Sequence, residues 1–330
     1  MRSLTDSWRL GGVEIANRLV LAPLAGIGNW FVRLQARRHG AGLVISEMVS
    51  SFGVKYGNER TMRELLRIHP EEHPVSIQLF GQDPEVMRDA AAVAAEAGAD
   101  LIDVNMGCPV RKVCKTGAGA ALLDDHDRAV AIARAAAQGG GLPVTVKLRP
   151  GHRPGERNGL TLARRLAEEA DVSGIAFHPR HASQQHKGAP DYDLAAELVE
   201  ALEVPVMLSG GLSTDQRVLE AFERSGADAV MLARGSLGNP WRFERLLGLR
   251  KGEPSADEVL EELDWMIERC DEHLGPGRSA RYLRKVYPWY AERLGLSKAL
   301  QQRLVKARST AAAREVLHQN RHGERPRLAA

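Results

Sequence analysis

Short apolar segments recur along the first part of this chain, and stretches with a helical pattern separate them. Each apolar segment lacks alternation, which is typical of parallel strands that are covered on both faces. Eight strands are predicted, at residues 18–22, 43–46, 74–79, 101–104, 143–148, 174–177, 205–208 and 229–232. Helices are predicted between them, at residues 84–97, 127–138, 160–169, 193–202 and 215–224.

The number and spacing of these elements predict the fold class. Eight strand–helix units fit a closed (β/α)8 barrel better than an open doubly wound sheet. The absence of a glycine-rich dinucleotide-binding motif near the first strand also argues against a Rossmann fold. Beyond residue 255 the strand signals stop, and helices are predicted at residues 257–273, 279–294, 297–307 and 310–317. We therefore predict an α/β TIM barrel with a C-terminal all-helical domain, and expect a catalytic domain at 1–250 and a helical domain at 255–330.

Composition narrows the class of protein. Hydrophobic residues make up 44% of the 330 residues, which is typical of a globular chain. No apolar run approaches the roughly 18 residues that cross a bilayer, and the first residues show no secretory leader. Three cysteines argue against a disulfide framework. We expect a cytoplasmic protein without a membrane partner.

Charge is distributed unevenly along the chain. From Arg278 onward there are thirteen Lys or Arg residues and three Glu residues, a net charge of +10, whereas the preceding part carries −7. A basic tail on an acidic body is the asymmetry expected of a nucleic-acid contact surface. The alternative is a solvated basic helix that has no partner.

Polar residues follow strand after strand, and in a barrel these positions converge on one rim. Gln78, Asn105 and Lys147 could hold the polar edge of a flavin ring, with Lys147 stabilising the negative charge of the reduced flavin. A lone barrel lysine could instead form the Schiff base of an aldolase, and Gln78 could be a satisfied core amide. Small residues in the last two loops predict a phosphate site, with Arg234 as a charged donor.

Cys108 lies on a loop between Gly107 and Pro109, just after a predicted strand, where a thiol can be a nucleophile or a proton donor. A proton donor must stay protonated, and the nearby Arg111 and Lys112 leave its protonation state open. A buried structural cysteine is the alternative. We expect no metal site, because no CxxC motif accompanies Cys108. Two other cysteines are interpreted as structural or incidental, namely Cys114 and Cys270. Three histidines lie in one loop, namely His178, His181 and His186. No pair of carboxylates accompanies them, so we expect no metal site there either.

Several motifs closely resemble those of the tRNA-dihydrouridine synthases over nearly the whole chain. They are Ala22-Pro23-Leu24-Ala25-Gly26, Ser46-Glu47-Met48-Val49-Ser50, Gln78-Leu79-Phe80-Gly81, Asn105-Met106-Gly107-Cys108-Pro109 with the following residues 113–123, Val146-Lys147-Leu148-Arg149 and Arg234-Gly235-Ser236-Leu237-Gly238-Asn239-Pro240-Trp241. In the tail, Tyr282-Leu283-Arg284-Lys285 and Trp289-Tyr290 resemble the RNA-binding helical domain of that family. The resemblance implies a flavoprotein oxidoreductase with FMN in the barrel, which reduces a tRNA uridine to 5,6-dihydrouridine and uses NADPH as reductant.

The resemblance also implies roles for residues. Cys108 would be the general acid that protonates uracil C5 while flavin N5 delivers hydride to C6. The FMN-binding residues would be Pro23, Leu24, Ala25, Gln78, Asn105, Lys147, His178, Gly210, Gly211, Ala233, Arg234 and Gly235. The tRNA-binding residues would be Asn105, Arg180, Arg281, Arg284, Lys285, Lys298, Arg303 and Lys306. We expect a monomer.

One motif departs from the family. After the sixth predicted strand the family has His-Gly-Arg-Thr-Arg, whereas this chain has His178-Pro179-Arg180-His181-Ala182. The change puts the local substrate contacts in doubt, and with them the choice of uridine. Two other functions fit parts of the sequence. An FMN reductase of small molecules would explain the barrel but not the basic tail, and a non-catalytic RNA-binding protein would leave Cys108 and Lys147 without a role.

Overall fold

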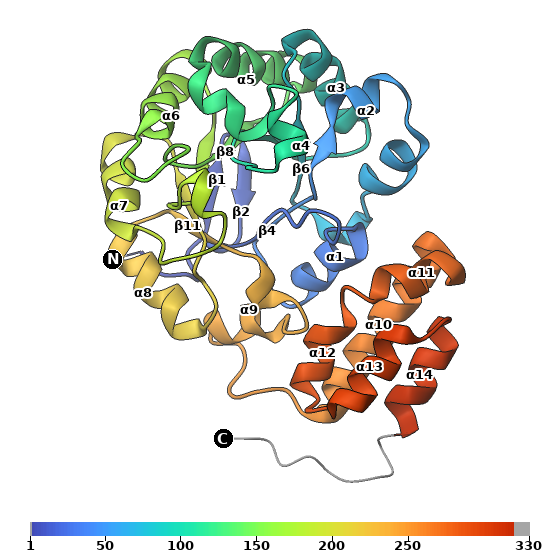
Figure 1. Ribbon diagram of the computed structural model, residues 1–330. Helices are drawn as coiled ribbons and strands as arrows, with labels where there is room; N and C mark the ends of the chain where they lie inside the picture. Colours follow the sequence, from blue (N-terminus) through green and yellow to red (C-terminus); the bar gives the residue numbers. More distant parts are fainter. Residues whose placement is uncertain (1, 320–330) are drawn as a thin grey trace. The chain divides into compact units, whose positions relative to one another are not determined.

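The computed structural model describes residues 2–319 and contains a closed barrel of eight parallel strands (Figure 1). Pairing of β4 with β6, and of β11 with β3, closes the sheet. The barrel strands are β3 (Leu19–Leu21), β4 (Leu43–Ile45), β6 (Val75–Phe80), β7 (Leu101–Asn105), β8 (Val144–Leu148), β9 (Gly174–Phe177), β10 (Val206–Ser209) and β11 (Ala229–Leu232). The predicted barrel and its eight strands are confirmed.

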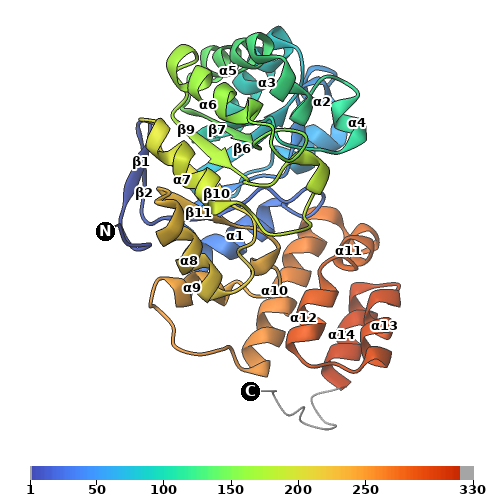
Figure 2. The same cartoon turned by 60° about the vertical axis from the view of Figure 1, so that its left-hand side comes forward.

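Five long helices surround the strands, where the sequence predicts them (Figure 2). They are α3 (Pro84–Glu96), α5 (His126–Gly140), α6 (Asn158–Glu169), α7 (Tyr192–Ala201) and α8 (Asp215–Ser225). Asp83 caps α3 by accepting hydrogen bonds from the Glu85 and Val86 amides. The apolar face of each helix covers the strands, so the strands are buried on both sides.

An antiparallel hairpin, β1 (Trp8–Leu10) and β2 (Val13–Ile15), precedes the barrel and was not predicted. Its apolar side chains join a core cluster with residues of the barrel strands. Leu10 packs closely on β9, because a Cβ at Gly174 would lie 2.8 Å from the Leu10 Cδ2 atom. The hairpin therefore completes the core at this part of the barrel.

Several shorter elements lie in the connections between strands. They are α1 (Trp30–Arg38), β5 (Val49–Ser50), α2 (Ser51–Lys55), the π-helical turn η1 (Thr61–Leu65), the 3₁₀ turns η2 (Pro70–Glu72), η3 (Gly119–Asp124), η4 (Ala182–Gln184) and η5 (Arg234–Ser236), and α4 (Arg111–Cys114). A fully buried ion pair ties α1 to η2, with Arg33 donating two hydrogen bonds to Glu72 at 2.7 and 3.0 Å. Arg33 also donates to the Gly28 and Arg67 carbonyls, so one guanidinium fixes three segments.

A second compact unit begins at Ser236, and the regular elements of its described residues are all helices. Its helices are α9 (Trp241–Leu246), α10 (Ala256–Leu274), α11 (Pro276–Leu283), α12 (Tyr287–Arg293), α13 (Lys298–Lys306) and α14 (Thr310–Gln319). The predicted C-terminal helical region is confirmed, while the predicted domain bounds of 1–250 and 255–330 stay predictions. Residues 320–330, with the basic residues Arg321, Arg325 and Arg327, lie outside the described residues.

The prediction of one helix over residues 279–294 is wrong, because the chain forms α11 and α12 there. Pro288 lacks a backbone N–H, and its ring would clash with the carbonyl four residues earlier, at Arg284. Proline is tolerated in the first turn of a helix, which is where it lies in α12. Within the described residues, no helix is both long and apolar enough to cross a membrane.

Candidate functional site

The polar residues predicted at the strand ends come together at the carboxyl rim of the barrel. Register places Gln78 of β6 beside Asp103 of β7, and Asn105 of β7 beside Lys147 of β8. These residues lie on three neighbouring parallel strands, and the second pair is two residues nearer the carboxyl ends than the first, so their side chains are within reach of one another. The sequence prediction that Gln78, Asn105 and Lys147 share one site is consistent with this arrangement.

Three buried side chains form a continuous set of hydrogen bonds, which we name the amide chain: Asp103, Gln78 and Asn105. Gln78 donates from Nε2 to Asp103 Oδ2 at 2.6 Å, and Asn105 donates from Nδ2 to Gln78 Oε1 at 2.9 Å. Asp103 also accepts from Thr145 Oγ1 at 2.6 Å. Asp103 and Gln78 are fully buried, and burial raises the pKa of Asp103 to about 6.

The Cys108 loop is held at its backbone. Asn105 Oδ1 accepts from the Cys108 amide at 2.9 Å and from the Gly107 amide at 3.3 Å. The Cys108 carbonyl accepts from the Ala120 amide at 3.0 Å and from the Cys114 thiol at 3.2 Å. Bonds on both sides of one residue leave the loop little freedom, so the half-buried Cys108 side chain has a defined place.

Burial raises the pKa of the Cys108 thiol, although a backbone hydrogen bond from Val110 and, after it, the charges of Arg149 and Lys147 oppose this shift. The desolvation of a thiolate in this position therefore outweighs the groups that would stabilise it. The raised pKa favours the protonated sulfur, which can donate a proton but is a weak nucleophile. The role of Cys108 as proton donor stays a prediction.

Arg149 braces the Cys108 loop from the position just after β8. Its guanidinium is buried and donates from Nε to the Gly107 carbonyl at 2.9 Å, and from Nη1 to the Arg180 carbonyl at 2.9 Å. It thus joins the loop after β7 to the loop after β9. Burial lowers the pKa of Arg149 to about 10, so it stays charged at neutral pH.

Lys147 places a positive charge at the centre of the rim. Its ammonium donates to Ser209 Oγ at the end of β10, at 3.2 Å. Burial first, and the charge of Arg149 second, lower the pKa of Lys147 to about 8, while Asp103 opposes this shift. A lysine with these neighbours remains mostly charged near pH 7 and can stabilise an anion placed next to it.

The loop after β9 contains a paired histidine and arginine. Arg180 Nη1 lies 3.2 Å from His178 Nε2, and Arg180 Nε and Nη2 donate to the Gly188 carbonyl. A guanidinium can only donate, so Nε2 of His178 accepts and its proton is on Nδ1. Burial and the charge of Lys147 lower the pKa of His178, which keeps it neutral. The side chain of Arg180 makes these hydrogen bonds within its own loop, and its role toward tRNA stays a prediction.

The loop after β10 is shaped by two glycines with positive φ, Gly210 at +99° and Gly211 at +79°. A Cβ at Gly210 would lie 2.4 Å from His178 Nε2, and one at Gly211 would lie 2.5 Å from the Tyr192 hydroxyl. Tyr192 donates to the Gly210 carbonyl at 3.0 Å. Backbone therefore approaches this part of the rim where a side chain would not fit, as an anion-binding loop requires.

The remaining predicted cofactor residues flank these loops. Leu24 is buried after β3 and Ala25 is exposed, while Arg234 lies after β11. Arg234 is close enough to Arg180 and His186 to lower the pKa of each, after burial as the main cause. Pro23, Ala233 and Gly235 complete this group in the loops after β3 and β11.

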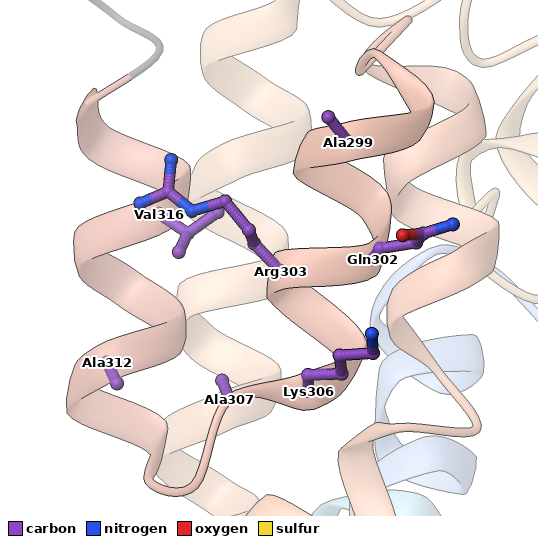
Figure 3. A pocket seen from close by; sticks show the side chains of 7 residues that line it. All are labelled: Ala299, Gln302, Arg303, Lys306, Ala307, Ala312 and Val316. Carbon is purple, nitrogen blue, oxygen red and sulfur yellow. The ribbon is translucent and has the colours of Figure 1, made fainter.

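The predicted tRNA-binding residues of the helical unit lie on α11, on the turn that follows it and on α13, and none of them is buried. They are Arg281, Arg284, Lys285, Lys298, Arg303 and Lys306. A hollow of about 510 Å³ lies between α13 and α14. Figure 3 shows Arg303 on α13 extending toward Val316 on α14, with Lys306 one turn further along α13. The hollow is left unfilled because several of its lining side chains are small, namely those of Ala299, Ala307 and Ala312.

Three residues of the site had no role predicted from the sequence: Asp103, Arg149 and Ser209. Asp103 carries a usable signal, because a charged residue inside an apolar strand is costly unless it has partners. The bonds of Arg149 and Ser209 join strands or loops far apart in sequence, so no local pattern indicates them. Among residues 2–319, no cluster of His, Cys, Asp or Glu is arranged to hold a metal ion.

The barrel and its rim define an enzyme of the (β/α)8 class, and comparison with known proteins defines the family. The family profile described as "Dihydrouridine synthase (Dus)" matches residues 20–322. tRNA-dihydrouridine synthase B of Pseudomonas aeruginosa is 37% identical over 287 residues, covering 86% of each chain. The same enzyme of Xanthomonas axonopodis pv. citri is 35% identical over 289 residues, again covering 86% of each. The chain belongs to the dihydrouridine synthase family and is a flavin-dependent oxidoreductase.

Solved structures that resemble the chain share its barrel. The old yellow enzyme homologue of Zymomonas mobilis has a TM-score of 0.59 at 15% identity, and covers 78% of this chain and 96% of its own. Morphinone reductase, solved in complex with tetrahydroNAD, has a TM-score of 0.52 at 17% identity, with 78% and 94% covered. At these identities the likeness concerns the fold alone.

Proposed function

We propose that this protein reduces a uridine in tRNA to 5,6-dihydrouridine with FMN as cofactor and NADPH as reductant. The observation that carries the proposal is the place of Cys108 on a loop at the rim of the barrel, where Asn105 accepts hydrogen bonds from the Gly107 and Cys108 amides. Burial raises the pKa of this thiol, as a proton donor requires. The family match supports the tRNA substrate, because the curated relatives are tRNA-dihydrouridine synthases.

The rim residues fit FMN by the chemistry of their donors. Lys147 and Arg234 supply positive charge, and the loop of Gly210 and Gly211 offers backbone to a phosphate without an intervening side chain. The Nδ1–H of His178 is left as a donor, because its Nε2 faces Arg180. Gln78, Asn105 and Lys147 would hold the polar edge of the ring, and Pro23, Leu24, Ala25, Ala233 and Gly235 would flank the cofactor.

FMN held by these residues, once reduced by NADPH, would supply the hydride that adds to uracil C6. The electron pair of the C5=C6 bond then gives enolate character at C5 and O4, and this needs a proton at C5. Cys108 donates that proton from Sγ, because burial keeps the thiol protonated. Arg149 and Lys147 lie close enough to stabilise the thiolate that remains after the transfer.

A uridine in folded tRNA must leave its stack to reach the barrel rim, at a cost of a few kcal/mol. Contacts between basic residues and phosphates supply binding energy that offsets this cost. We assign these contacts to Arg281, Arg284, Lys285, Lys298, Arg303 and Lys306 of the helical unit. We expect the protein to act as a monomer in the cytoplasm, where tRNA is modified.

Replacing the thiol tests the proposal. Cys108→Ala should lower the rate of dihydrouridine formation by about 10²–10⁴-fold, the usual contribution of one general acid, while FMN stays bound. Mass spectrometry of tRNA incubated with enzyme and NADPH measures the product. Cys114→Ala is the matched control, because this thiol lies beside the Cys108 carbonyl and takes no part in the proposed transfer. An unchanged rate for Cys108→Ala would exclude Cys108 as the proton donor.

A further inference from the structure

We propose that Asp103 is a positioning residue that sets the direction of the amide chain and thereby holds the Cys108 loop. The proposal deepens the proposed function and rests on it for the importance of the loop. Asp103 acts on Cys108 indirectly, through the two amide side chains of Gln78 and Asn105.

Both ends of the amide chain have a fixed hydrogen-bonding character. At one end the Asp103 carboxylate, when ionised, can only accept hydrogen bonds. At the other end the backbone N–H groups of Gly107 and Cys108 can only donate. Gln78 and Asn105 lie between these ends, and each amide has one donor side and one acceptor side.

Only one orientation of the two amides satisfies both ends. Because Asp103 accepts, Gln78 turns its Nε2 toward the carboxylate, which leaves Oε1 to accept from Asn105. Asn105 therefore turns its Nδ2 toward Gln78, and its Oδ1 faces the Cys108 amide. If Gln78 were reversed, Asn105 would have to reverse as well, and its NH₂ group would face the N–H of Cys108.

The surroundings make this orientation costly to lose. Gln78 and Asp103 are fully buried, and Asn105 is 7% exposed, so water has little access to replace a missing partner. Thr145 holds the second oxygen of the carboxylate from β8. The carboxylate is thus fixed by one neighbouring strand and orients an amide on the other.

A simpler role for Asp103 is to provide a negative charge near Lys147, whose pKa it raises. The two roles differ in what they require. The counter-charge role requires only the negative charge of the carboxylate. The positioning role requires a hydrogen-bond acceptor at residue 103 that faces Gln78. An asparagine at position 103 separates these roles, because it removes the charge but can still turn its oxygen toward Gln78.

Thr145 decides which way that asparagine turns. In Asp103→Asn the new NH₂ group can face the Thr145 hydroxyl, which is able to accept, so the oxygen still faces Gln78. In Asp103→Asn combined with Thr145→Val, the NH₂ group has an apolar neighbour on the β8 side. Gln78 Oε1 is then its nearest alternative acceptor, so the side chain at position 103 no longer holds the amide chain in one direction. Thr145→Val alone keeps the carboxylate and serves as the matched control.

The test is hydrogen exchange at the Cys108 backbone amide, measured by NMR in the absence of tRNA. It compares the unsubstituted protein, Asp103→Asn, Thr145→Val and the double variant. We expect exchange in the double variant to accelerate roughly fivefold to tenfold, the effect of removing about one net hydrogen bond. Each single variant should stay within about twofold of the unsubstituted protein. The rate of iodoacetamide alkylation at Cys108, in a Cys114→Ala background, should rise in the double variant alone.

Unchanged exchange in the double variant would overturn the proposal. Equal acceleration in Asp103→Asn and in the double variant would overturn it in favour of the counter-charge role. If the double variant does not fold, Gln78→Met breaks the chain with the carboxylate intact and should accelerate exchange to the same degree; no acceleration there is also contrary to the proposal. Because exchange and alkylation need neither tRNA nor NADPH, they remain informative even if the protein forms no dihydrouridine.

Discussion

Gly210 lies where the loop after β10 meets the ring of His178. Its φ of +99° is unfavourable for any other residue, and a Cβ there would lie 2.4 Å from His178 Nε2. Two separate costs therefore apply to a side chain at this position, one from the backbone and one from the close approach to the ring.

Gly210→Ala should destabilise the barrel by roughly 1–3 kcal/mol from backbone strain, with a further contribution of about the same size from the displaced ring. It should also weaken FMN binding, because His178 is proposed to contact the cofactor. Urea unfolding and fluorescence titration with FMN measure the two effects. Gly98→Ala is the control, since Gly98 has a φ of +98° with no atom within 4 Å of the added Cβ. Equal FMN affinity in both variants would argue against the assigned place of His178.

The residues of the rim differ in how far sequence could define them. Cys108, Asn105, Gln78 and Lys147 each belong to a strand or the loop after it, so their meeting at one rim follows from the barrel alone. The protonation state of Cys108 could not be predicted, because burial opposes charges whose positions depend on the fold. The charged neighbours in sequence, Arg111 and Lys112, were a poor guide, because the positive charges that act on the thiol belong to Arg149 and Lys147, some forty residues further along the chain.

Among the elements, the barrel strands and the five long helices around them were predictable, whereas the hairpin and the short elements of the connections were not. A buried parallel strand is apolar throughout, so its signal is local. The hairpin Trp8–Leu10 and Val13–Ile15 has strands of only three residues, too short for a pattern to register. α1 was missed although it is buried, since Arg33 and Gln35 interrupt its apolar face and are paired only in the folded chain.

The ion pair between α1 and η2 yields a prediction at this scale. Glu72→Gln should destabilise the barrel by about 3 kcal/mol, because it leaves the buried Arg33 charge without its carboxylate. Denaturant unfolding measures the change. Glu59→Gln is the control, because Glu59 pairs with Arg63 where both side chains are largely exposed, and such pairs contribute little. If the two substitutions had equal effects, the pair would not be what fixes α1.

At the scale of the whole molecule, the acidic body and basic tail give a measurable salt dependence. Replacing Arg281, Arg284, Lys298 and Lys306 by Gln should weaken tRNA binding and flatten the plot of log affinity against log salt, by about 0.7–0.9 for each phosphate that is no longer neutralised. Filter binding over a range of KCl concentrations measures the slope. Arg165→Gln and Arg224→Gln remove charges that already pair with carboxylates on barrel helices, and should leave the slope unchanged. An unchanged slope for the first set would place the docking face elsewhere.

Closure of the sheet through β3 and β11 has a consequence for how this chain comes into being. Leu19 and Val230 are register partners, although nearly the whole barrel sequence separates them. All eight strands must therefore be synthesised before β3 can pair with β11. Until then the incomplete sheet has two unpaired edges rich in Val, Leu and Ile. Until β11 has been made, such a nascent chain exposes apolar strand edges that are prone to aggregation.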